Sequence, residues 1–154
     1  MKHHLLSAPY IMWVVILFGV AINFALWPYE FVYQTSSLSF VLFALAFLYW
    51  VYFFIKATAK NLQAPHRPYH ITQLVTTGVY KWVRHPMYSA DIVLAWGIAV
   101  AYPLAALWMS ALWLTIIMTI WAYVEENILL KRFSEEYGLY RRHTPMFFPL
   151  KKKK

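Results

Sequence analysis

Two clusters of chemically active residues stand beside long apolar segments of the chain. Arg84-His85-Pro86 leads directly into one apolar run, and the acid pair Glu125-Glu126 follows another. A proline suits the first turn of a helix, whose free N–H groups lie at the positive end of the helix dipole, where a carboxylate or phosphate can bind. The paired acids offer the opposite chemistry, since they accept from an ammonium or from ribose hydroxyls and favour a nearby sulfonium.

Only a few residues around Pro103 connect these two apolar runs. The runs are therefore expected to form an antiparallel helical hairpin, in which the start of one helix and the end of the other lie at the same depth. Both clusters should then face one pocket. A ligand with one carboxylate and two positive centres would match them, and S-adenosyl-L-methionine is such a ligand.

The elements that position these clusters belong to a membrane protein. The 154 residues are 62% hydrophobic and 13% charged, which leaves too little polar surface for a soluble domain of this size. A helix needs about 20 apolar residues to cross a bilayer. We predict an all-α, single-domain integral membrane protein over residues 1–154, with about four transmembrane helices at 10–27, 38–55, 87–102 and 104–124.

Positive charge predicts the orientation. The 14 Lys and Arg comprise Lys2, five residues between Lys56 and Arg84, and eight from Lys131 onward. By the positive-inside rule, both termini, the loop 56–86 and the tail 125–154 are cytoplasmic. The net charge of +8 thus indicates contact with anionic lipid head groups rather than with nucleic acid. The chain has no cysteine to act as a metal ligand, and no metal site is expected.

Three smaller features complete the pattern. A turn is expected at Gly78. An amphipathic helix should follow the last span, run along the membrane surface and end near Gly138. The tail after this helix is expected to be extended. Asp91 lies about one and a half turns into the third span. An acid at that depth is functional by default, but Asp91 is also close enough to the interface to be solvated.

Two blocks of sequence carry a family resemblance. "GVYKWVRHPMY" (78–88), the apolar hairpin, and "EENILLKRFSEEYGLYRRHTPMFFP" (125–149) resemble the isoprenylcysteine carboxyl methyltransferase and phospholipid methyltransferase superfamily of membrane enzymes. The resemblance implies a cytosol-facing S-adenosyl-L-methionine pocket and a lipid-side tunnel for a lipophilic acceptor. It assigns the cofactor to residues of these blocks: Tyr80, Arg84, His85, Pro86, Tyr88, Glu125 and Glu126.

The resemblance also indicates an acceptor side. The family's tail often has a basic residue two positions before its first proline, and this chain has His143 there with Arg141 and Arg142 upstream, so all three are expected beside the polar head of the acceptor. Arg142 and His143 are therefore the expected catalytic residues. A carboxylate or thiolate acceptor needs no base, whereas a neutral amine or thiol would need His143 or a glutamate.

Two other functions fit parts of the pattern. Membrane sterol reductases share a similar helical core and use NADPH, but their corresponding block usually has Asn where Met87 stands here, and the double Glu favours methyl transfer. A non-enzymatic four-span scaffold would have no need for charged clusters matched in depth across a hairpin.

Overall fold

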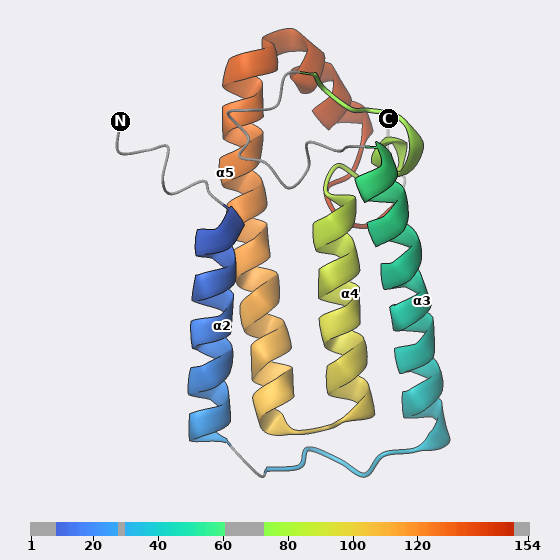
Figure 1. Cartoon of the computed structure of the whole chain (residues 1–154), viewed down its shortest axis with the longest axis vertical. Helices are drawn as coiled ribbons and strands as arrows, with labels where there is room; N and C mark the ends of the chain where they lie inside the picture. The colour runs from blue at the N-terminus through green and yellow to red at the C-terminus, as the bar shows by residue number, and fades with distance from the viewer. Residues whose placement is uncertain (1–8, 28–29, 61–72, 150–154) are drawn as a thin grey trace.

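A computed structural model describes residues 9–27, 30–60 and 73–149. Most of the expected central loop, the extreme N-terminus and the terminal lysines lie outside these residues. Four α-helices and one short 3₁₀ helix are present in this part of the chain (Figure 1). They are α2 (Pro9–Leu26), α3 (Ser37–Lys60), η2 (Gly78–Lys81), α4 (Pro86–Ala101) and α5 (Ala105–His143).

The helices confirm the expected all-α membrane fold. Three of them, α2, α3 and α5, are long and apolar enough to cross a bilayer. The fourth, α4, is apolar but has only 16 residues. It is thus shorter than the about 20 residues of a typical span, as the sequence had indicated.

The four α-helices form two pairs that lie side by side in one bundle. In Figure 1, α2 runs beside α5 and α3 runs beside α4, with α4 also packed against α5. The α2–α3 connection meets the α4–α5 turn at one end: Val32 N–H donates to Pro103 C=O at 2.8 Å, and Ala105 N–H donates to Glu30 C=O at 2.7 Å. The start of α4 consequently lies at the opposite end, beside the distal part of α5, as the hairpin argument predicted.

Helix α5 extends further than expected. It continues past Gly138 to His143, so the expected end near Gly138 is wrong. The break in the helix occurs instead at Ser134, whose φ of 40° and ψ of −108° are non-helical. The segment after the break bends over the end of the bundle toward α4 (Figure 1). Buried Tyr137 and the hydrogen bond from Tyr140 to the Tyr80 carbonyl hold this segment against the bundle.

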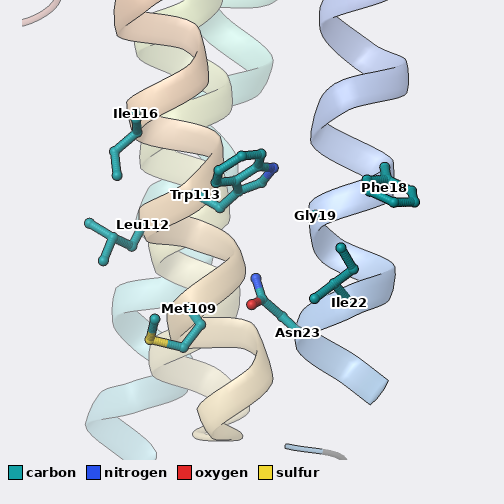
Figure 2. A pocket seen from close by; sticks show the side chains of 8 residues that line it. All are labelled: Phe18, Gly19, Ile22, Asn23, Met109, Leu112, Trp113 and Ile116. Carbon is teal, nitrogen blue, oxygen red and sulfur yellow. The ribbon is translucent and has the colours of Figure 1, made fainter. Parts of the chain in front are cut away.

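Small residues allow the helices to approach closely. Gly97 of α4 faces Ala46 of α3, and Gly19 of α2 faces the Trp113 indole of α5. Trp113 Nε1 donates to the carbonyl of Val15 at 3.1 Å. Figure 2 shows Gly19 and Trp113 beside an apolar cavity of about 320 Å³ between α2 and α5. Without a hydrophobic driving force in lipid, such close packing is a main source of helix association.

Adding a methyl group at Gly19 should therefore weaken the α2–α5 contact. A Cβ at this position would lie 2.0 Å from Trp113 Nε1. We expect Gly19→Ala to lower the stability of the detergent-solubilised protein by about 1–3 kcal/mol, the usual cost of overpacking. Gly138→Ala is the matched control, because nothing lies within 4 Å of its added Cβ. Equal thermal unfolding midpoints for the two variants would contradict this packing.

Candidate active site

Arg84 is the centre of a buried polar network. Its side chain is only 5% exposed, and its Nε donates to Glu126 Oε1 at 2.7 Å. Its NH1 group donates to the backbone carbonyls of Arg141 and Thr144. These carbonyls belong to the end of α5, where no further turn of helix supplies donors. Arg84 therefore joins the start of α4 to the acid pair and caps the end of α5.

Glu126 receives three basic groups. Besides Arg84, His85 Nε2 lies 3.2 Å from Glu126 Oε1. Arg141 Nε lies 3.1 Å from Glu126 Oε2, an ion-pair distance at which the N–H is not aligned for a hydrogen bond. The Glu126 side chain is 1% exposed, whereas that of Arg141 is 39% exposed. We call Arg84, His85, Glu125, Glu126 and Arg141 the rim cluster.

Glu125 lies in the same turn of α5 as Glu126 but has a different hydrogen-bond partner. Its Oε1 accepts a 2.7 Å hydrogen bond from the Tyr88 hydroxyl, and its Oε2 lies 3.7 Å from His85 Nδ1. The rings of His85 and Tyr88 stack at a centroid distance of 5.5 Å. Because these two residues lie in adjacent turns at the start of α4, they present a continuous aromatic wall to Glu125.

Glu125 and Glu126, which follow the apolar part of α5, have pKa values shifted in opposite directions. Burial raises the pKa of Glu125, although His85 and the Tyr88 hydroxyl oppose that shift. Burial also acts to raise the pKa of Glu126, but hydrogen bonds from His85 and Arg84 outweigh it, and the net pKa is lowered. Glu126 is therefore ionised at neutral pH, while Glu125 takes up a proton more readily.

The tail after α5 closes over the start of α4. Arg84 N–H donates to Pro145 C=O at 2.9 Å, and His85 N–H donates to Met146 C=O at 3.0 Å. The Phe147 ring lies 6.0 Å from the His85 ring. Residues 144–149 form no helix and bend at Thr144 and at 146–148, so the tail is irregular rather than extended as expected. Its contacts cover one face of the rim cluster.

The block that precedes Arg84 is held from the same side. Gly78 has a φ of +65°, which confirms the expected turn. The next residues form η2, and Tyr80 is buried there with its carbonyl accepting from the Tyr140 hydroxyl. Tyr80 is thus placed beside the distal segment of α5.

The structure brings most of the expected cofactor residues together, but not the expected acceptor residues. Arg142 and His143 are both exposed. Within residues 9–27, 30–60 and 73–149, neither side chain forms a hydrogen bond or an ion pair. Arg141, one position earlier, is the tail base that reaches the acid pair. The sequence could not rank three consecutive basic residues, because their directions depend on the helical phase after the break at Ser134.

Tyr137 is a further site residue that the sequence did not single out. It is 1% exposed, and its hydroxyl has no hydrogen-bond partner in the described part of the chain. The Tyr137 and Tyr140 rings lie 5.9 Å apart. Their three-residue spacing places both on one helical face, a signal that could have identified them.

Removing Arg84 should unfold the rim cluster. Arg84→Gln leaves the buried Glu126 charge without its closest partner, and breaking such a pair costs about 3–5 kcal/mol. The double variant Arg84→Met/Glu126→Leu should regain much of that stability, since it removes both charges. Arg142→Gln, at an exposed position, should change stability by less than about 0.5 kcal/mol. Thermal unfolding in detergent measures all three, and an Arg84→Gln variant as stable as Arg142→Gln would contradict the role given to Arg84.

Comparison with known proteins supports the resemblance carried by these blocks. Residues 37–136 match the family described as phospholipid methyltransferase. The match includes α3, η2, α4 and the part of α5 that carries the acid pair. No curated protein and no solved structure matches the chain significantly. Because the family match covers well over half of the 154 residues, the chain belongs to the phospholipid methyltransferase family.

Proposed function

We propose that this protein transfers a methyl group from S-adenosyl-L-methionine to a lipophilic acceptor at the cytoplasmic face of the membrane. The observation that carries the proposal is the meeting of buried His85 with the partly buried Tyr88 and Glu125 where the start of α4 lies beside α5. Family membership supports methyl transfer in a membrane protein. The charge and hydrogen-bonding groups of the rim cluster support the choice of methyl donor.

The residues present fit this cofactor. The start of α4, with Pro86 at its first turn, supplies free N–H groups suited to the carboxylate of the cofactor. Glu125 and the aromatic wall of His85 and Tyr88 suit its positive centres. The Tyr137 hydroxyl, buried without a partner among the described residues, is a donor and acceptor ready for a polar group such as a ribose hydroxyl.

The contacts of Arg84 and Glu126 suggest a supporting role for this pair. All of the hydrogen bonds that hold Arg84 run to other parts of the chain, and Glu126 is enclosed by basic groups. We therefore assign both as positioning residues, which hold His85 and Glu125 in place. Tyr80 contributes through its contact with Tyr140.

The chemistry requires little from the protein beyond placement. Bound at this site, S-adenosyl-L-methionine would supply a methyl group on a sulfonium, which would pass to the acceptor while the sulfur keeps the electron pair of the S–CH₃ bond. The rim cluster would hold the two reactants in line and keep water out. An acceptor that attacks as a neutral amine must first lose a proton, for which Glu125 or His143 is the candidate base.

The acceptor side is assigned to the exposed end of α5. Arg142 and His143 stand there, next to the covering tail, where they can meet the polar head of a membrane-borne acceptor. A guanidinium pairs with phosphate or carboxylate through two parallel hydrogen bonds. This geometry suits a phospholipid head group, the acceptor class that the family name suggests.

Ligand binding should distinguish this function from nicotinamide chemistry. S-adenosylhomocysteine should raise the thermal unfolding midpoint of the purified protein, and NADPH should not. Glu125→Gln should weaken S-adenosylhomocysteine binding about tenfold or more, because a charge-assisted hydrogen bond contributes roughly 1.5–3 kcal/mol. Glu135→Gln, an exposed acid of the same helix, is the matched control. Stabilisation by NADPH alone, or unchanged affinity in Glu125→Gln, would overturn the assignment.

We also propose four membrane passes with both termini in the cytoplasm. The support is the position of Arg84 and Arg141 at one end of the bundle, opposite the uncharged turn at Pro103. Reporter fusions after residue 35 and after Pro103 should report an external location. Fusions after Lys60 and Lys154 should report an internal one. An internal reading at residue 35 would contradict the four-pass topology.

A further inference from the structure

Asp91 is an acid inside the apolar helix α4, outside the rim cluster. Its Oδ1 accepts a 2.8 Å hydrogen bond from the Trp50 indole N–H of α3. No lysine, arginine or histidine forms an ion pair with it within residues 9–27, 30–60 and 73–149. An acid at membrane depth is costly unless it is paired, and a neutral indole does not balance a charge. The geometry thus leaves room for a cation from outside the chain.

An aromatic track on α3 leads along the bundle to this acid. The rings of Phe43, Phe47, Trp50 and Phe54 follow one another, with centroid distances of 6.4, 6.1 and 5.1 Å. Phe47 is 45% exposed, so the track is open toward the lipid. Because Trp50 is both a member of the track and the partner of Asp91, the track and the carboxylate form one surface.

This surface suits an amphiphilic ligand, which has an apolar chain and a charged head group. Its apolar part matches a hydrocarbon chain lying along α3. Its acid matches a positive head group, while the Trp50 indole N–H holds that acid in place. Neither part alone would choose a ligand, since any lipid chain can cover an aromatic face. The carboxylate restricts the choice to a lipid that carries an amine or another cation.

The acid is also close to the rim cluster along α4. Asp91 follows Tyr88 by three residues, so the two lie on neighbouring parts of one helical face. The Tyr88 hydroxyl in turn donates to Glu125. A head group held at Asp91 would therefore sit about one helical turn from the residues assigned to the methyl donor.

We propose that Asp91 and Trp50 form a docking site for the ammonium head of a membrane-borne amine, whose chain lies along the aromatic track. The further role of this site, as the entry site of the methyl acceptor, rests on the function proposed above. The binding of a lipid amine does not depend on that function. The bound species is a lipid amine rather than a free amine, because the track contributes apolar contact that a small water-soluble amine cannot use.

Binding of model amphiphiles to the purified full-length protein tests this site. Dodecylammonium should bind at least about tenfold more tightly than dodecanol, and free ethanolamine should not bind measurably. Asp91→Asn should reduce dodecylammonium affinity about tenfold or more, as expected for loss of a charge-assisted contact. Asp91→Glu should retain most of the affinity, and Glu135→Gln should leave it unchanged.

Several outcomes would overturn the docking site. Equal binding of dodecylammonium and dodecanol would show an apolar surface only. Binding of free ethanolamine as tight as dodecylammonium would remove the role of the track. Unchanged dodecylammonium affinity in Asp91→Asn would remove the acid, and a folded Asp91→Glu variant that has lost binding would do the same. S-adenosylhomocysteine affinity, measured in the same variants, should stay at the wild-type value. This measurement distinguishes failure of the docking site from failure of the proposed methyl-donor site.

Discussion

The buried contact between Arg84 and Glu126 is the interaction on which the rest of the structure depends. It joins the start of α4 to the distal part of α5, and the same guanidinium holds the last carbonyls of α5. Charges at this position are tolerated because Glu126 lies among the basic groups Arg84, His85 and Arg141, and because Arg84 also donates to two backbone carbonyls. The bend at Ser134 allows the end of α5 to turn back and supply those carbonyls. Helix hairpin, bend and tail are therefore parts of one closed arrangement.

This arrangement separates support from ligand contact. Glu126 is enclosed by Arg84, His85 and Arg141, whereas the polar partners of Glu125 among the described residues are Tyr88 and His85. Adjacent residues of a helix point about 100° apart, so one acid of a pair can stabilise the fold while its neighbour faces a ligand. The opposite directions of their pKa shifts reflect this difference in surroundings. A ligand would find a preformed wall rather than a flexible pair of acids.

Polar groups continue from the rim cluster into the bundle. Tyr88 connects the cluster with α4, Asp91 follows one turn later, and Trp50 connects Asp91 with the aromatic face of α3. Close packing at Gly97 and Ala46 brings α3 near enough to α4 for this contact. On the other side of the bundle, α2 and α5 contact each other through Trp113 and apolar residues. The contact of Asp91 with Trp50 thus extends the polar groups of the rim cluster to the α3–α4 side of the bundle.

The sequence by itself determined the all-α membrane fold, the turn at Gly78 and the meeting of Arg84 and His85 with the acid pair. Each follows from local rules: apolar length, a glycine turn, and a connection too short for anything but an antiparallel hairpin. Only the tertiary structure decided which groups serve the fold. It paired Arg84 with Glu126, and it brought Arg141, rather than its neighbours Arg142 and His143, to the same acid. The reason is the bend at Ser134, a non-helical conformation with no marker in the sequence, which sets the direction of every side chain after it.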